Sequence, residues 1–306
     1  MSTTTDTRDL MVTIRCLVYN HAPYLRQCLD GFVMQQTNFR FEAIVHDDAS
    51  TDGSADIIRE YAEKYPDIIK PIIETENQYS KHDGSIRRIM NAHTHGKYVA
   101  LCEGDDYWTD PLKLQKQVDF LEQNSDYSLC GTNGWVRYER IGKKDRLFNN
   151  ISISTELFPK DIIGHWTLPT AGLLFRSDIY RDYPSWARKV YSGDQTLILL
   201  SMNKGRIYAF ADVCCVYRRD AANTSSVSMK VRRTKSRAYV ITQSIILYNE
   251  FHKYTGDKYI QYLMPLLENL RHKEKVYKMM DRSVLLAALR YPITFLRILK
   301  SRKNNK

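Results

Sequence analysis

The chain has 306 residues, of which 43% are hydrophobic, so it can bury a substantial core and is not a disordered protein. Its net charge of +10 is concentrated at one end, because residues 227–306 hold 18 Lys and Arg against 5 Asp and Glu. Residues 1–226 hold 27 Lys and Arg against 30 Asp and Glu. The basic character therefore belongs to the tail, and the body of the chain is nearly neutral.

The six cysteines form no CxxC pair and lie mostly in apolar runs, which favours buried, reduced thiols. The first ten residues, MSTTTDTRDL, are polar and lack the apolar stretch of a signal peptide. No uncharged apolar run reaches the roughly 18 residues that a membrane-spanning helix needs. These features predict a cytoplasmic protein without membrane-spanning helices.

Strand-like and helix-like runs alternate through the first 125 residues. Apolar runs predict four strands, each followed by an amphipathic helix, at 11–18, 39–45, 68–74 and 98–102. Pro71 should place the third strand at a sheet edge or distort it. Asn20 is a candidate N-cap for the first helix, and Asp110, followed by Pro111, for the fourth.

Beyond residue 126 the pattern is mixed. It predicts strands near 127–139, 170–176 and 206–217, a helix after Asp194, and mainly helices over 236–300. The alternation in the first half predicts the α/β class, with a mostly parallel sheet flanked by helices and a helical C-terminal extension.

Polar clusters follow three of the predicted strands: YNHAP after the first, HDDAST after the second and EGDDYW after the fourth. Ligands of parallel sheets bind beyond the carboxyl ends of the strands, so these clusters should meet at one rim. In the last cluster, Glu103, Asp105 and Asp106 place three carboxylates within four positions. Mg²⁺ and Mn²⁺ prefer such oxygens and would remove their mutual repulsion. A solvated acidic turn before Asp110 is the alternative.

The thirteen glycines form neither G-x-G-x-x-G nor G-x-x-x-x-G-K-[ST], which argues against a dinucleotide-dependent dehydrogenase and a P-loop phosphotransferase. Four segments in order, VTIRCLVYNHAPYLRQCLDGFVMQQ, FEAIVHDDASTDGSADIIREY, ENQYS and GKYVALCEGDDYWTDPLKLQKQVDFLE, resemble glycosyltransferase family 2. The resemblance covers roughly residues 11–220. It implies the A-type fold and an inverting transferase that uses nucleotide-diphosphate sugars, with a UDP-sugar as the expected donor.

The resemblance assigns the nucleotide to the first two clusters. Tyr19 and Asn20 occupy the family's YN position, which borders the nucleobase. Asp47 matches the acid that reads the base edge, and Asp48 its neighbour near the ribose. Asp52, together with Ser54, is expected to cap the next helix instead.

The resemblance assigns the metal and the diphosphate to the third cluster and its surroundings. Asp105 and Asp106 match the family's acidic pair, and Asp106 is the first choice for a direct ligand of Mn²⁺ or Mg²⁺. Glu103 stands where many relatives have Asp, so it lies behind the ligands or contacts the donor sugar. Arg87 matches a nucleotide-contacting arginine, and Arg88 competes for that role.

A catalytic base is the remaining requirement, because inversion in one displacement needs a deprotonated acceptor hydroxyl. Asp194, in SGDQTLILL, is an ordinary N-cap candidate on bare sequence, whereas the resemblance implies that it is the base. In VYRRDAANTSS, Arg218 or Arg219 would neutralise the diphosphate or pair at the surface. Residues 220–222 replace the His and glycines of many relatives, which implies a less flexible flap.

These observations predict a catalytic domain over 1–226, with a nucleotide-sugar half at 11–125 and an acceptor half at 126–226, and a basic helical region at 227–306. The implied activity is transfer of a hexosyl or N-acetylhexosaminyl group to a glycan or lipid-linked glycan in bacterial surface polysaccharide or lipopolysaccharide assembly. A catalytically inactive sugar-binding relative and a sugar nucleotidyltransferase are the alternatives. A nucleic-acid partner is not expected, since the basic tail lacks a stacking platform and any recognition motif.

The tail at 281–306 mixes apolar residues with Arg282, Arg290 and Arg297, and Pro292 should break or kink its helix. It could lie in the interface of an anionic membrane, as a peripheral attachment to the cytoplasmic face of the inner membrane. The alternative is that it packs on the protein itself.

Overall fold

The computed structural model describes residues 8–139, 142–188, 190–219 and 237–303. Its contacts divide the chain into two compact units. The first comprises Met1–Tyr183 with Leu197–Thr224, and the second Pro184–Thr196 with Ser225–Lys306. Each unit is described by itself below.

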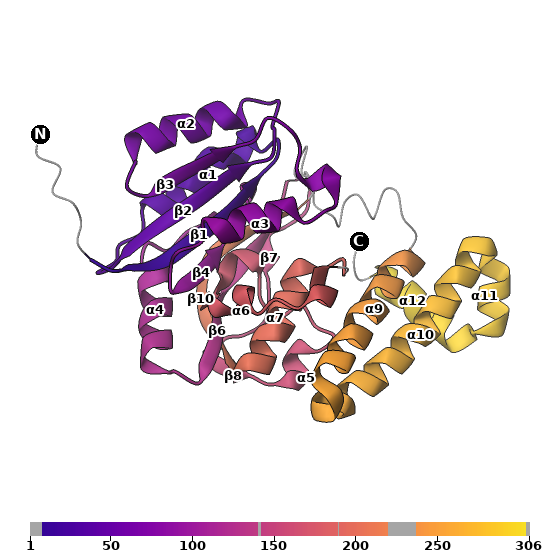
Figure 1. Cartoon of the computed structure of the whole chain (residues 1–306). Coiled ribbons are helices and arrows are strands. Elements are labelled where there is room, and N and C mark those ends of the chain that lie inside the picture. Colours follow the sequence, from indigo (N-terminus) through magenta and orange to yellow (C-terminus); the bar gives the residue numbers. More distant parts are fainter. Residues whose placement is uncertain (1–7, 140–141, 189, 220–236, 304–306) are drawn as a thin grey trace, which may run out of the picture. The chain divides into compact units, whose positions relative to one another are not determined.

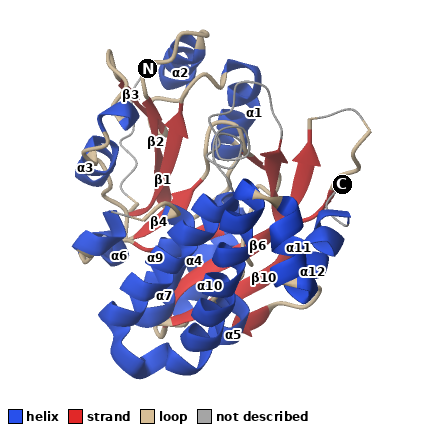
Figure 2. Ribbon diagram, turned by 90° about the vertical axis from the view of Figure 1, so that its right-hand side faces the viewer, coloured by secondary structure: helices blue, strands red, loops and turns tan. Residues whose placement is uncertain are grey.

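The first unit is built on one sheet with the strand order β3-β2-β1-β4-β9-β6-β10-β5. One half of it is entirely parallel and consists of β1 (Leu10–Val18), β2 (Arg40–Asp47), β3 (Ile69–Ile73) and β4 (Tyr98–Leu101). Figure 2 shows these four strands side by side. The prediction for Pro71 is confirmed, because β3 is the edge strand of this order. A proline at the edge leaves no central ladder bond unmade.

The other half of the sheet combines parallel and antiparallel strands, and it contains the strands predicted near 127–139, 170–176 and 206–217. It contains β5 (Tyr107–Trp108), β6 (Tyr127–Tyr138), β9 (Leu173–Arg176) and β10 (Arg206–Arg219), with β7 (Arg146–Leu147) paired to β6 and β8 (Thr155–Leu157) to β10. β10 runs parallel to β6, whereas β9 is antiparallel to both of its neighbours. The strand predicted at 170–176 is shorter than expected, because its first residues form a 3₁₀ turn, Thr170–Gly172.

Helices cover both faces of the parallel half. α1 (Ala22–Val33), α2 (Ser54–Lys64) and α4 (Lys113–Gln123) bury their apolar side chains in one core with alternate residues of β1, β2 and β4. α3 (Ser85–Ala92) contacts the opposite face, where its Asn91 bonds Arg15 of β1. Figure 1 shows α2 and α3 on opposite sides of these strands. The predicted α/β class is confirmed. This unit also holds the short α5 (Pro159–Ile162) and α6 (Asp178–Arg181), together with all of α7 (Gly193–Lys204) after its first turn.

The order 3-2-1-4 creates a topological switch point between β1 and β4. Chain connections leave β1 toward β2 on one side, while β4 joins β1 from the other. Loops at the carboxyl ends of such neighbouring strands diverge and open a crevice between them. The segments that follow β1 and β4 are the ones that carry YNHAP and EGDDYW.

The second unit is helical, which confirms the prediction for 236–300. It contains the first turn of α7 (Gly193–Lys204), a 3₁₀ turn (Ser185–Arg188), α9 (Arg237–Thr255), α10 (Ile260–Arg282), α11 (Val284–Arg290) and α12 (Pro292–Lys303). Pro292 separates the last two helices, as expected of a residue that tolerates only the first helical turn. Among the described residues, no helix is both long and apolar enough to cross a membrane.

All six cysteines are free and buried, as predicted. The predicted N-cap role of Asp110 is wrong, because α4 begins two residues later than expected and its N-cap is Leu112, whose backbone N–H donates to Asp110 Oδ1 at 2.8 Å. Asp110 Oδ2 additionally lies 2.8 Å from Lys116 Nζ. The flap at 220–226, including the residues that replace His and glycines, lies outside the described residues.

Candidate active site

The loops after β1 and β2 are held together by side chains of one bonding to backbone of the other. Asn20 has a left-handed backbone with φ of 57°, and its Oδ1 accepts the N–H of Thr51 at 2.8 Å. The predicted N-cap role of Asn20 is therefore wrong. Asp52 caps α1 from the neighbouring loop instead, since its Oδ2 accepts the N–H of Ala22 at 2.9 Å. Its Oδ1 accepts the N–H of Ser54 at the start of α2, as predicted.

The two aspartates at the end of β2 are both buried, but their carboxylates differ in their partners. Asp47 accepts the N–H of Ser50 on Oδ2 at 3.0 Å, while its Oδ1 has no hydrogen-bond partner in the described part of the chain. Asp48 accepts the N–H of Gln78 at 2.5 Å and that of Tyr79 at 3.1 Å. Asp47 thus retains a buried acceptor, which costs free energy unless a donor arrives. Asp48 already fixes a loop.

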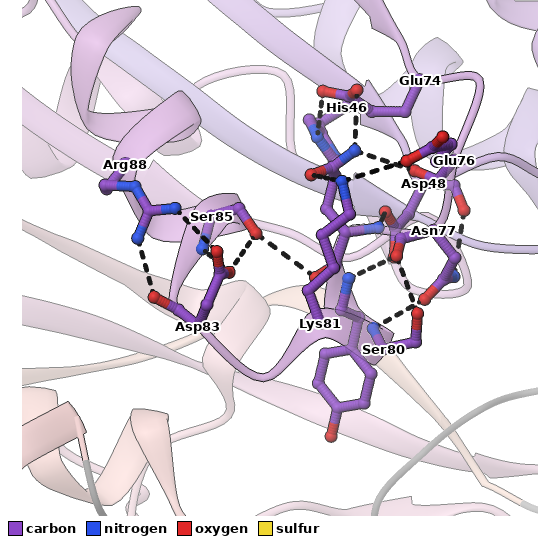
Figure 3. Close-up of polar contacts among 12 residues, drawn as sticks. His46, Asp48, Glu74, Glu76, Asn77, Ser80, Lys81, Asp83, Ser85 and Arg88 are labelled. Atoms are coloured by element: carbon purple, nitrogen blue, oxygen red, sulfur yellow. Dashed lines mark hydrogen bonds and ion pairs between the residues drawn. The ribbon is translucent and has the colours of Figure 1, made fainter.

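That loop is the segment 74–88, shown with its polar contacts in Figure 3. Asn77 donates from Nδ2 to the backbone oxygen of Asp48 at 3.1 Å. Glu74 lies 3.3 Å from Nε2 of the buried His46 on β2. Asp83 accepts from Arg88 Nη2 at 3.0 Å, so Arg88 is committed to an exposed ion pair. The first part of the loop, residues 74–79, is therefore anchored to the end of β2, while the pair Asp83–Arg88 joins two residues of the loop itself.

Arg87 differs from Arg88 in having no carboxylate partner in the part of the chain that the structure describes. Its guanidinium lies over the ring of Tyr183, 4.6 Å from the centroid, and its buried Nη1 lacks a hydrogen-bond partner among the described residues. The sequence left Arg87 and Arg88 as competitors. The structure leaves only Arg87 with a free buried donor.

Arg15, which the sequence did not lead us to predict as a site residue, lies next to Arg87. It is buried on β1, its Nη1 donates to Asn91 Oδ1 at 2.9 Å, and its Cζ lies 4.2 Å from the centroid of the Tyr180 ring. Burial, and the nearby charge of Arg87, lower the pKa of Arg15. Tyr180 and Tyr183 are themselves neighbours, with centroids 6.0 Å apart. A charged residue in the middle of the apolar run VTIRCLV was the signal that could have identified it.

The acidic segment after β4 forms a tight turn whose aspartates are buried. Asp105 is 7% and Asp106 4% exposed, while Glu103 is exposed. The N–H of Asp106 donates to the backbone oxygen of Glu103 at 3.0 Å, and that of Gly104 to Leu17 of β1 at 3.0 Å. The turn is thus fixed against the end of β1.

The two buried carboxylates fit a cation site. Burial, and then the neighbouring charge of Asp105, raise the pKa of Asp106 well above its usual value. Asp106 Oδ1 accepts the N–H of Arg218 at 2.8 Å, whereas the carboxylate of Asp105 has no hydrogen bond or ion pair within the described ranges. Two adjacent carboxylates in a buried turn cost free energy unless a cation compensates them. Asp105 offers the freer ligand, although the sequence ranked Asp106 first.

Arg218 is engaged throughout by the protein. Its Nη1 donates to the backbone oxygen of Asp105 at 2.7 Å, its Nη2 donates to Gln27, and its Nε lies 3.2 Å from Glu139 Oε1. The guanidinium also lies over two tyrosine rings, those of Tyr24 and Tyr107, 4.9 and 4.5 Å from their centroids. It therefore braces the acidic turn.

His21, in the loop after β1 and directly before α1, is a further residue that the sequence did not lead us to predict. It is buried, its N–H donates to Ser54 Oγ at 3.0 Å, and its Nδ1 has no partner among the described residues. Burial lowers its pKa despite the nearby charge of Asp105. A Cβ added to Gly104 would lie 2.8 Å from His21 Nδ1, so the glycine lets the acidic turn approach this ring.

A second acidic cluster lies at β5 and β10 and does not fit a cation site. Asp110, Asp212 and Cys214 bring their ligand atoms within 4.8 Å of one another. Lys116 Nζ already lies 2.8 Å from Asp110 and 2.9 Å from Asp212. The ammonium supplies the positive charge that a metal would otherwise provide.

Asp194 lies inside the first turn of α7 and not ahead of it, as the sequence had suggested. The capping position belongs to Ser192, whose backbone oxygen accepts the N–H of Thr196 at 3.1 Å. Its Oγ also accepts the N–H of Gln195 at 3.4 Å. Asp194 is half-buried and belongs to the second unit. Tyr19, the remaining predicted residue, is half-buried directly after β1.

Comparison with known protein families gives one match over most of the first unit. The model of the family described as Glycosyl transferase family 2 matches residues 16–184. An uncharacterized protein of Mycobacterium tuberculosis is 37% identical over 211 residues, 69% of this chain and 59% of that protein. The putative teichuronic acid biosynthesis glycosyltransferase TuaG of Bacillus subtilis is 31% identical over 130 residues, 40% of this chain and 49% of TuaG. The match thus spans about three fifths of the mycobacterial relative.

Solved structures with the same fold include TarS of S. aureus in complex with UDP-GlcNAc. Its TM-score is 0.57 at 18% identity, over 78% of this chain and 66% of TarS. The mannosyltransferase PcManGT from Pyrobaculum calidifontis, in complex with GDP-Man and Mn²⁺, gives 0.54 at 17% identity over 94% and 82%. At these identities the likeness shows the fold alone.

Proposed function

Because the chain belongs to glycosyl transferase family 2, we propose that it transfers a sugar from a nucleotide-diphosphate sugar to an acceptor hydroxyl, with inversion at the anomeric carbon. One observation carries the proposal. Asp47, Asp105 and Arg87 each leave a buried or nearly buried polar group without a partner among the described residues. Asp105 follows β4, which flanks the switch point where α/β sheets bind their ligands, and Asp47 ends β2, the neighbour of β1.

The nucleoside is the partner we assign to the loops after β1 and β2. The unpartnered Oδ1 of Asp47 is an acceptor for an N–H of the base edge, as a uracil ring offers. Tyr19 borders the base, and Asn20 fixes the loop that carries it. Asp48 positions the loop 74–88 beside the ribose. A UDP-sugar is the donor that we expect.

Mn²⁺ or Mg²⁺ is the cofactor that we assign to the acidic turn. Asp105 would supply a free carboxylate and Asp106 its remaining oxygen, while Glu103 lies behind them or contacts the sugar. When bound, the cation would stabilise the charge that develops on the diphosphate leaving group. The Mn²⁺ held by PcManGT is in keeping with this assignment.

The diphosphate is the anion that we assign to Arg87. Its buried Nη1 needs an acceptor, and a phosphate oxygen would make a charge-assisted hydrogen bond. Arg15 raises the positive potential around Arg87 and has no carboxylate among the groups that influence its pKa. Arg218, each of whose three guanidinium nitrogens has a partner within the protein, holds Asp106 in place through its backbone N–H.

Asp194 is the base that we propose. Deprotonation of the acceptor hydroxyl on the face opposite the leaving group requires a carboxylate there. Ser192 already caps α7, so a capping role does not account for an aspartate at position 194. The acceptor would be a glycan or lipid-linked glycan in bacterial surface polysaccharide assembly, reached from the cytoplasm. The name of TuaG supports this context.

A screen of UDP- and GDP-sugars with Mn²⁺, measuring released nucleoside diphosphate, tests the proposal. We expect turnover of one donor class, and loss of nucleotide binding in Asp47→Asn. Asp56→Asn is the matched control, because Asp56 is exposed and pairs with Arg59. Binding without turnover for every donor would favour an inactive sugar-binding relative. Synthesis of a nucleotide-sugar from a nucleoside triphosphate would favour a nucleotidyltransferase.

A further inference from the structure

The last two helices pack by one face and leave a large apolar face uncovered. Ala287 of α11 and Ile298 of α12 are buried, and Ile298 packs with Ala238, Val276 and Tyr277 of α9 and α10. The tail therefore does pack within its own unit. Yet four large apolar side chains remain in solvent, with exposed fractions of 57% for Leu286, 72% for Leu289, 67% for Ile293 and 56% for Leu296.

These four side chains form two exposed pairs, which together are named here the apolar stripe. Leu286 and Leu289 are three positions apart on α11, and Ile293 and Leu296 are three apart on α12. Residues at this spacing lie on the same face of a helix. Scattered exposed leucines are ordinary, but two such pairs on consecutive helices mark a surface that becomes buried against something else.

A basic cavity of about 1050 Å³ adjoins the stripe, between α10 and α12. Its lining includes five basic residues and one acid: Arg271, His272, Lys273, Lys275, Arg297 and Glu268. His272 Nε2 lies 2.7 Å from Thr294 Oγ1, which ties the two walls together. Arg297 follows Leu296 directly and stands four positions after Ile293, so it lies where the cavity meets the stripe.

We propose that the apolar stripe and this cavity form a lipid-binding surface for an anionic membrane. The stripe enters the boundary between headgroups and acyl chains, and the cavity receives the phosphate of a phospholipid headgroup. An amphipathic helix lying in the interface combines these two features, an apolar face and Lys or Arg beside it. Residues 227–306 hold 18 Lys and Arg against 5 Asp and Glu, and this excess of positive charge attracts an anionic membrane surface.

Charge distinguishes an anionic membrane from the other candidate partners of this surface, a second copy of the chain and a soluble phosphate. A second copy of the chain would bring the same strongly basic helices together, which like charges oppose. A soluble phosphate would fill the cavity but leave the stripe in water. A membrane with anionic lipids covers both. The inference rests on the second unit alone, so it stands or falls independently of the transferase activity.

Sedimentation of the full-length protein with vesicles tests the proposal. One vesicle set is pure phosphatidylcholine, and the other is an equimolar mixture with phosphatidylglycerol. We expect binding to the mixed vesicles that weakens as salt is added. The double variant Leu289→Ser/Ile293→Ser should bind at least roughly tenfold more weakly, because it removes two large apolar side chains from the surface that enters the membrane. Ile153→Ser, which removes an apolar side chain 79% exposed in the first unit, is the matched control.

The cavity has its own variant. Arg297→Gln should weaken binding to the mixed vesicles about fivefold, as expected for one basic residue near an anionic surface, and leave binding to phosphatidylcholine unchanged. Lys64→Gln, an exposed residue of α2, controls for the loss of one charge. Circular dichroism and donor hydrolysis show that each variant is folded. Wild-type binding by both stripe and cavity variants would overturn the proposal, as would binding of inorganic phosphate without vesicle binding.

Discussion

The backbone N–H of Arg218 donates to Asp106 Oδ1 at 2.8 Å, and the Nη1 of the same arginine donates to the backbone oxygen of Asp105 at 2.7 Å. One residue at the end of β10 thus holds both aspartates of the turn after β4. The pairing of Val216 with Tyr107 brings these distant segments together. The acidic turn is therefore shaped before any cation binds.

This clamp predicts that Arg218 acts through Asp106. Arg218→Gln should lower the melting temperature, because it leaves the buried backbone oxygen of Asp105 without this donor, a cost of about 1–3 kcal/mol. It should also weaken Mn²⁺ binding, with a smaller effect on UDP affinity at saturating Mn²⁺. Calorimetric titrations of each ligand make the comparison, with Arg219→Gln as the neighbouring control. A loss confined to UDP affinity would instead indicate direct contact with the diphosphate.

The acidic pair predicts metal dependence. Donor turnover should require Mg²⁺ or Mn²⁺, and Asp105→Asn should abolish the stabilisation that Mn²⁺ gives in a thermal melt. Without metal, the same variant should melt at or above the wild-type temperature, since it relieves the repulsion between two buried carboxylates. Wild-type turnover in excess chelator would contradict the assignment.

The raised pKa of Asp106 predicts a pH effect on stability. A carboxyl group with a raised folded-state pKa binds its proton more tightly in the folded protein than in the unfolded chain. The metal-free unfolding free energy should therefore decrease as the pH rises from the ordinary Asp pKa of about 4 through the raised value. Denaturant titrations at several pH values should show a shallower decrease in Asp106→Asn. Parallel profiles for the two proteins would show that Asp106 is not the group responsible.

The contrast between the adjacent arginines predicts unequal effects. Arg87→Met should weaken UDP binding by about 10- to 100-fold, the value of a charge-assisted hydrogen bond of about 1.5–3 kcal/mol. Arg88→Met, which breaks only an exposed pair with Asp83, should bind UDP like the wild type. Arg15→Met should weaken UDP binding by an intermediate amount, because it removes a nearby positive charge but no direct hydrogen bond to the diphosphate. Equal losses at 87 and 88 would refute the distinction.

Asp194→Asn separates catalysis from helix stability. The change removes a negative charge from the first turn of α7, which should cost only about 0.3–1 kcal/mol. As a base, however, an amide cannot accept the proton, so transfer should fall by about 10²–10⁴-fold with donor affinity unchanged. Initial rates, with UDP titrations alongside, decide the matter. A variant that transfers at the wild-type rate would place the base elsewhere.

The sequence alone determined the class of fold and the chain segments that form the candidate site. Alternating apolar periods set the strands and helices, and Pro71 was enough to place β3 at an edge. The polar clusters after β1, β2 and β4 could be assigned to one rim because parallel strands end on the same side. These are local patterns, and each can be read within one stretch of chain.

Only the tertiary structure decided which side chains within those clusters are free. Asn20 does not cap α1, because its Oδ1 accepts the N–H of Thr51. Asp52, from another loop, accepts the N–H of Ala22 instead. Arg88 forms an ion pair with Asp83, whereas the buried Nη1 of Arg87 has no hydrogen-bond partner among the described residues. Arg15 contacts Asn91 of α3 and the Tyr180 ring of α6, and both residues lie far from it along the chain. A hydrogen-bond partner is set by distances between segments far apart in the chain, which residue spacing within one segment does not encode.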